Sequence, residues 1–127
     1  MAVEGDYFAL KILSAADLSA YQYFPVTAAG ARATGATAYA TAIGINQEKP
    51  LSGEHFRVTW LGESKFRAGG TITAGAHLTL NASGYFVAAT SGLTISGRAV
   101  LAATSGSIGT GIFDFAAGMH KSAVSYA

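Results

Sequence analysis

The chain has 127 residues, of which half are hydrophobic and only 12% are charged, against about 25% in an average soluble domain. Its net charge of +1 gives no electrostatic basis for binding nucleic acid or a membrane surface, and its hydrophobicity excludes intrinsic disorder. Because the chain has no cysteine, neither a disulfide framework nor a thiolate metal site is possible. The length is that of one domain with one core.

Residues 1–20 differ from the rest of the chain, because they mix four charged residues with large apolar ones. The large apolar residues are Tyr7, Phe8, Leu10, Ile12, Leu13 and Leu18, and the first five of these are the proposed contact residues of the arm. Their spacing fits neither strict alternation nor a helical stripe, although Ser14 can cap a short turn. We interpret this segment as an N-terminal arm that covers its own domain or contacts a neighbour. A frayed terminus is the alternative.

The arm lacks the basic start and the long apolar stretch of a signal peptide. No window of the chain approaches the roughly 20 apolar residues that span a bilayer. The sequence therefore predicts a soluble protein that is synthesised in the cytoplasm.

From Tyr21 onwards the pattern becomes strand-like. Pro25 indicates an edge strand or a bulge, because proline cannot donate to a sheet ladder. Residues 28–35 are expected to form a flexible hairpin loop. Residues 39–45 read as a strand of small residues, with a helix as the alternative, and residues 46–50 as a turn.

The next segment alternates more cleanly. Phe56, Val58 and Trp60 are predicted to share one face, with Arg57 and Thr59 on the other. We expect a glycine at position 62 to break this strand, and residues 64–67 to continue it. The interleaved acids and bases of residues 54–67 favour a solvated strand face over a phosphate site.

Between Arg67 and Asp114 the only charged residue is Arg98. Short β-type runs near residues 71–73, 78–80, 85–89, 94–102 and 108–115 are separated by glycine-containing turns, including a tight hairpin at 81–84. This spacing predicts an all-β fold, a small barrel or sandwich with little helix. A protein body with so few charges favours contact with neighbouring proteins in a lattice or an oligomer. The predicted core residues are Phe56, Val58, Trp60, Ile72, Leu78, Leu80 and Phe86.

Signals for catalysis are poor. His55, His77 and His120 have neither an i, i+4 partner nor a carboxylate at ligand spacing, and His55 beside Glu54 needs a nucleophile that the sequence does not offer. The glycine-rich residues 106–111 resemble a phosphate loop, but a β-type run follows and no lysine is present, so a hairpin is favoured. Asp114 either caps a turn or pairs with Arg98. We therefore expect no enzyme, no cofactor and no metal.

A set of short motifs occurs in a distinctive order along the chain. They are DLSAYQYFPV from residue 17, AIGINQEKP from 42, GEHFRV from 53, RAGGTITAG from 67, LTL at 78–80, GYFVAA from 84, SGRAVL from 96 and GTGIF from 109. This order resembles the small capsid decoration (cement) proteins of tailed bacteriophages, over about residues 17–115. The loop at 28–35 and the tail after Phe115 depart from the family pattern.

The resemblance implies a compact β-barrel or β-tulip body at residues 21–115, between the arm and a C-terminal tail at 116–127. It also implies binding to the major capsid protein on the outside of the expanded head, commonly as a homotrimer and often through a terminal arm. No catalysis, nucleic acid or membrane is implied. The alternative is a carbohydrate- or receptor-binding module on the virion surface, with Trp60, Tyr39 and Tyr85 as a sugar platform, although their alternation favours the core. A small hydrolase or isomerase lacks a nucleophile–base pair.

Overall fold

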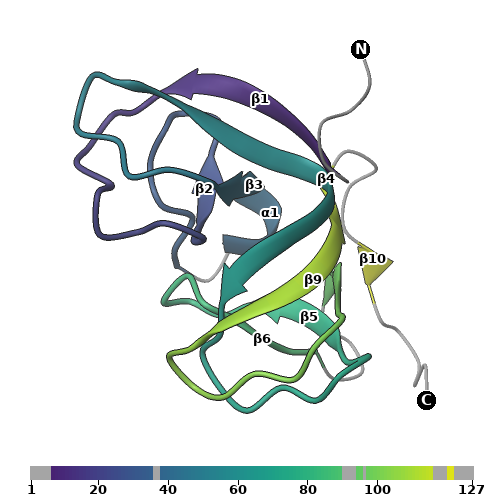
Figure 1. Cartoon of the computed structure of the whole chain (residues 1–127). Coiled ribbons are helices and arrows are strands. Elements are labelled where there is room, and N and C mark those ends of the chain that lie inside the picture. The colour runs from purple at the N-terminus through teal and green to yellow at the C-terminus, as the bar shows by residue number, and fades with distance from the viewer. Residues whose placement is uncertain (1–6, 36–37, 90–93, 96, 116–119, 122–127) are drawn as a thin grey trace.

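The computed structural model describes residues 7–35, 38–89, 94–95, 97–115 and 120–121. These residues form an almost entirely β structure, which confirms the predicted fold class (Figure 1). One four-residue helix, α1 (Ala38–Thr41), precedes β3, so both alternatives for residues 39–45 are partly realised. The strands are β1 (Tyr7–Leu13), β2 (Pro25–Thr27), β3 (Ala42–Asn46), β4 (His55–Arg67), β5 (His77–Leu80), β6 (Phe86–Ala88), β7 (Thr94–Ile95), β8 (Gly97–Ala99), β9 (Ile108–Asp114) and β10 (His120–Lys121).

Eight of the strands form one curled antiparallel sheet with the order β2-β3-β4-β9-β8-β5-β6, and β1 pairs with β4 beside this path. Strand β4 is the centre of the fold. Residues 58 and 59 pair with both β1 and β3, so these two strands lie on opposite edges of β4. Residues 61–67 then pair with β9. One long strand thus joins an N-terminal half to a C-terminal half.

The N-terminal half has a small core of its own, formed by Leu18, Val26, Phe56 and Val58. The expected alternation in β4 ends at Val58, because β1 pairs with residues 59 and 61 and skips Trp60. This bulge leaves Thr59 fully buried and Trp60 half-buried, outside both core clusters. The predicted break at Gly62 is wrong, because β4 continues through it with a φ of 106°.

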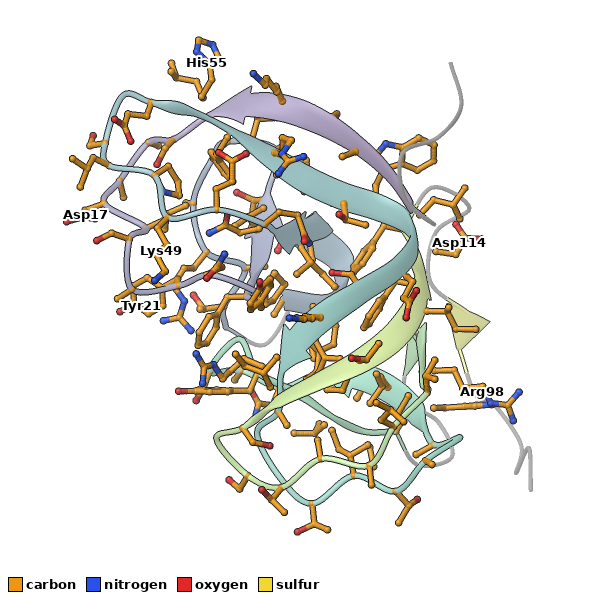
Figure 2. The ribbon with its side chains drawn as sticks, viewed as in Figure 1. Asp17, Tyr21, Lys49, His55, Arg98 and Asp114 are labelled. Carbon is orange, nitrogen blue, oxygen red and sulfur yellow. The ribbon has the colours of Figure 1, made fainter. Side chains whose placement is uncertain are left out.

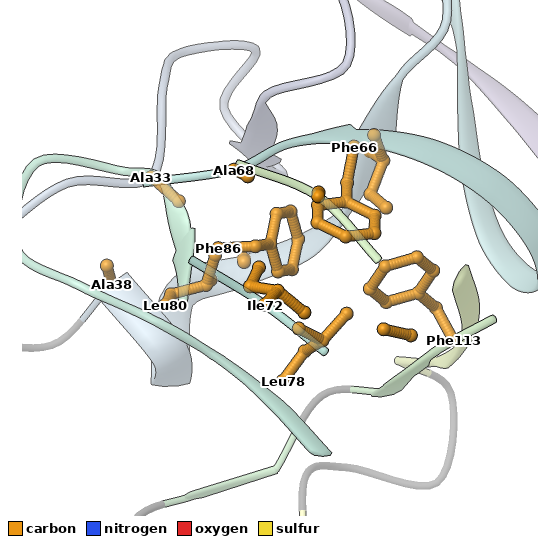
Figure 3. Packing of buried hydrophobic residues seen from close by; sticks show 13 residues of the cluster. Ala33, Ala38, Phe66, Ala68, Ile72, Leu78, Leu80, Phe86 and Phe113 are labelled. Atoms are coloured by element: carbon orange, nitrogen blue, oxygen red, sulfur yellow. The ribbon is translucent and has the colours of Figure 1, made fainter. Parts of the chain in front are cut away.

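The larger core lies in the C-terminal half and is centred on three phenylalanines (Figure 3). Phe66 contacts Phe86 and Phe113 edge-on, with ring centroids 5.6 and 5.8 Å apart, and Phe86 lies 5.1 Å from Phe113. Edge contacts of this kind stabilise a core beyond simple area burial. Of the predicted core residues, Ile72, Leu78, Leu80 and Phe86 are buried in this cluster, and Phe56 and Val58 in the smaller one.

Strand β9 faces this core with glycines. Its inward positions are Gly109, Gly111 and Phe113, and a Cβ at Gly109 would lie 2.6 Å from Cζ of Phe66. The Phe66 ring therefore occupies the space that a side chain at position 109 would need. As a consequence, the large aliphatic residues of β9 point outward.

Candidate interaction surfaces

The described residues contain no cluster suited to metal binding. No group of three His, Asp or Glu side chains lies close enough there to hold a metal ion. His55 is exposed at the start of β4 and His77 is half-buried at the start of β5, while the His120 side chain is outside the described residues. Figure 2 shows His55, Asp17 and Asp114 well separated from one another. Within the same residues, no helix has the length and apolarity to cross a membrane.

The acidic side chains of Glu54, beside His55, and of Asp17 stabilise turns. The Glu54 carboxylate accepts a hydrogen bond from the Leu51 amide (2.8 Å) and so closes the turn before β4. Asp17 accepts from the amide and hydroxyl of Ser19, which hold the pKa of its carboxyl below the ordinary value. These contacts show structural roles for both acids.

The glycine-rich segment 106–111 forms the end of the loop after β8 and the start of β9, which pairs antiparallel with β8, as the hairpin interpretation predicted. Arg98, on β8, donates from Nε to the carbonyl of Gly75 (2.9 Å) and makes no ion pair with Asp114 in the described structure. Figure 2 shows the two side chains apart on the same side of the molecule.

The proposed contact arm lies on its own domain as strand β1. It pairs with β4 from Tyr7↔Gly62 to Leu13↔His55, and the Ile12 side chain packs against the smaller core. Leu10 is 37% exposed and Leu13 is 52% exposed. The side chains of Tyr7 and Phe8 are outside the described residues. Among the described strands only β4 pairs with β1, so the outer edge of β1 presents unpaired main-chain groups.

The end of β1 is tied down by main-chain hydrogen bonds. The amide of Ser14 donates to the carbonyl of Glu54 (2.8 Å), and the amide of Ala15 donates to that of Gly30 (3.1 Å). This brings Leu13 to the same end of the molecule as Leu51, which is also 52% exposed. We call Leu10, Leu13 and Leu51 with the outer edge of β1 the arm surface.

A second apolar surface lies on the outside of β9. Ile108 and Ile112 alternate with the inward glycines and are 45% and 50% exposed. Val100 and Leu101 follow β8 and are 45% and 59% exposed, and their amides both donate to the Thr110 carbonyl of β9. We call these four aliphatic residues the β9 face. The arm surface and the β9 face together hold all seven exposed large hydrophobic residues of the described chain.

Two arginines and three aromatic rings form a third feature. The guanidinium carbon of Arg32 lies 4.3 Å from the ring centroid of Tyr21 and 4.8 Å from that of Phe24, and that of Arg67 lies 5.9 Å from the Phe24 centroid. Tyr85 contacts Phe24 edge-on at 5.0 Å. The arginine side chains therefore stack on rings that are themselves packed together.

The same arginines hold the walls of a shallow pocket of about 300 Å³. Arg32 donates to the carbonyl of Ser83 (2.6 Å) and Arg67 to that of Gly106 (2.9 Å). Ser83, Gly106 and Tyr85 line this pocket. Of the residues suggested for a sugar platform, Tyr85 lies here, Trp60 lies in the β4 bulge beside β1, and the side chain of Tyr39, in α1, is outside the described residues. The arginines fasten loops from distant parts of the sequence.

Fold and surfaces together define a charge-poor antiparallel β domain with two exposed apolar surfaces. Comparison with protein-family models gives no match, and comparison with curated protein sequences gives none either. Among solved structures, the chain is similar to the N base of the head fiber gp8.5 of bacteriophage phi29, with a TM-score of 0.60 and 18% sequence identity. The alignment covers 84% of this chain and 93% of the phage domain, so nearly the whole fold is shared.

Proposed function

We propose that this protein is a non-enzymatic structural component of a bacteriophage virion, which binds the outer surface of the capsid and stabilises the expanded head as a homotrimer. The observation that carries the proposal is the shared fold, because a head fiber base matches over 84% of the chain. The order of decoration-protein motifs in residues 17–115 supports the same class independently of the fold.

The arm surface is the part of the molecule that we assign to the capsid, and the major capsid protein is the proposed partner. An edge strand can accept a strand from another chain, because main-chain hydrogen bonds supply affinity and alternate side chains supply register. Strand β1 offers such an edge, with Leu10 and Leu13 exposed beside it. Only one charged residue, Lys11, interrupts β1, so little charge has to be desolvated.

Stabilisation of the head follows from binding alone. A protein that binds only the assembled, expanded shell lowers the free energy of that state by mass action through each bound copy. This effect requires no chemical reaction.

The test is a binding assay on undecorated expanded capsids. We expect saturable binding and a higher temperature of capsid disruption. Leu13→Asp should weaken binding about tenfold or more, because one buried leucine contributes roughly 1.5–3 kcal/mol and the aspartate must be desolvated. Thr73→Asp, an exposed position outside both apolar surfaces, serves as the matched control. Absence of binding to any capsid form would refute the proposal.

A second candidate function is a carbohydrate- or receptor-binding module on the virion surface. The pocket of about 300 Å³ beside Tyr85 favours it, because hydroxyl and amide groups of Ser83 and Asn81 line the same space. A glycan array tests it directly. Hits that disappear with Tyr85→Ala would support this candidate, and an array without hits would remove it.

A further inference from the structure

The exposed side of β9 carries an ordered row of charge, aliphatic side chain and opposite charge. Glu63 on β4 pairs in register with Ile112 on β9, and Ile112 pairs in register with Arg98 on β8. Directly paired residues of an antiparallel sheet project to the same face. All three are exposed, so the acid and the base stand on opposite sides of Ile112 on one surface.

Among the described residues, neither charge of this row forms an ion pair within its own chain. Across the described residues the ion pair present is Arg57–Glu48, and neither Glu63 nor Arg98 belongs to it. Within the described part of the chain, Arg98 donates from Nε to the Gly75 carbonyl and from neither of its terminal nitrogens. Two strand spacings separate the backbones of Glu63 and Arg98, about 10 Å, so Ile112 keeps the two groups apart.

The other basic residues of β4 on this side lean away from β9. Nζ of Lys65 lies 5.9 Å from the ring centroid of Tyr23, and the Arg67 guanidinium lies over Phe24 and donates to the Gly106 carbonyl. The centre of the surface is therefore left to Ile108, Ile112, Val100 and Leu101. An apolar centre with charges at its margin is the usual anatomy of a protein interface.

Rotational symmetry makes this surface complementary to itself. When copies are arranged around an axis parallel to β9, with β9 nearest the axis, the β4 side of each copy meets the β8 side of the next. Glu63 then meets Arg98 of the neighbouring copy at every contact, and the Ile112 side chains converge on the axis. An axis perpendicular to the strands in the plane of the face would instead bring Glu63 against Glu63, which is unfavourable.

We infer that the β9 face is the self-association surface of this protein, with a second copy of the chain as the occupant and Glu63–Arg98 ion pairs between neighbouring copies. The inference deepens the trimer proposed above and assigns it a surface, so the arm surface stays free for the capsid. In a ring of three, each copy contributes one Glu63 to one contact and one Arg98 to the other, so that every charge of the row is paired.

The experiment is sedimentation velocity and equilibrium on the full chain and four variants. We expect a trimer for the unmodified protein. Glu63→Arg and Arg98→Glu should each weaken association tenfold or more, because each places like charges together at every contact. The double variant Glu63→Arg with Arg98→Glu should restore association, because the two charges change places and opposite charges again meet at every contact. Lys11→Glu, on β1, is the matched charge-reversal control and should sediment like the unmodified protein.

Thermal unfolding by circular dichroism separates loss of association from loss of folding. Glu63→Arg and Arg98→Glu single variants that keep a cooperative transition and sediment as monomers support the inference. A monomeric unmodified protein would overturn it, as would single variants that still form trimers or a double variant that remains monomeric. A monomer that binds capsids would overturn this inference together with the proposed homotrimer and would leave capsid binding standing, whereas a trimer that binds no capsid would refute the proposed capsid binding alone.

Discussion

Phe66→Ala should be among the most destabilising single substitutions in this domain. Phe66 is completely buried and contacts Phe86 and Phe113 edge-on at 5.6 and 5.8 Å. Truncating a buried phenylalanine to alanine costs about 3–5 kcal/mol, because apolar contacts are lost and a cavity remains. A domain of this size is stable by about 5–15 kcal/mol, so the substitution removes a large share of the total.

The assay is equilibrium unfolding in urea, followed by the fluorescence of Trp60, the only tryptophan of the chain. A loss of about 4 kcal/mol corresponds to a fall of roughly 15 °C in Tm for 127 residues, at about 2.1 cal/mol/K per residue. Phe115→Ala is the matched control, because Phe115 is half-buried and stacks on the edge of the same cluster. It should cost about 1–2 kcal/mol. If Phe66→Ala costs no more than Phe115→Ala, the three-ring core is not the centre of stability.

Two further predictions concern the close approach of Gly109 to Phe66 and the carboxyl group of Asp17. Gly109→Ala should destabilise by about 1–3 kcal/mol in urea unfolding, because its Cβ would lie 2.6 Å from Phe66, whereas Gly70→Ala, with no atom within 4 Å, should change stability by less than about 0.5 kcal/mol. Equal effects would contradict the packing of β9. The lowered pKa of Asp17 means that its stabilising contribution is complete above the unfolded-state pKa and is lost as pH falls through the folded-state pKa. Ser19→Ala removes the hydroxyl and keeps the amide, so it should raise the pKa of Asp17 in an NMR titration, and an unchanged pKa would show that the Ser19 hydroxyl is not the main cause.

Local chemistry made several elements predictable from the sequence. Pro25 indicated an edge strand or bulge, and β2 is an edge strand with a register shift after Val26. The hairpin at residues 81–84 joins β5 to β6, with Gly84 at a φ of 84°. Such features depend on a few neighbouring residues, so the sequence states them directly.

Features that depend on distant partners were not predictable in the same way. The bulge at Trp60 arises from the register between β1 and β4, which are more than 40 residues apart. Phe66 alternates with Lys65 and Arg67, so its burial had a sequence signal that the predicted core omitted. Phe113 was harder to identify, because the other inward positions of β9 are glycines and its isoleucines point outward.

The arm surface and the β9 face also depend on residues that are distant in the sequence. The arm at residues 1–20 had two open interpretations, its own domain or a neighbour's, and the structure places residues 7–13 on β4 of the same chain. Its contact with a capsid remains a proposal. The low charge between Arg67 and Asp114 predicted contact with neighbouring proteins in general. The row of Glu63, Ile112 and Arg98 follows only from the register of β4, β9 and β8 in the structure.

The central claim is that this domain binds the outside of a phage head through the arm surface. The most direct measurement is a cryo-EM map of undecorated expanded capsids mixed with the purified protein. We predict density for the domain on the outer capsid surface, with β1 toward the shell and the β9 faces of neighbouring copies together. Bare capsids at saturating protein, or domains attached with β1 facing solvent, would contradict the account.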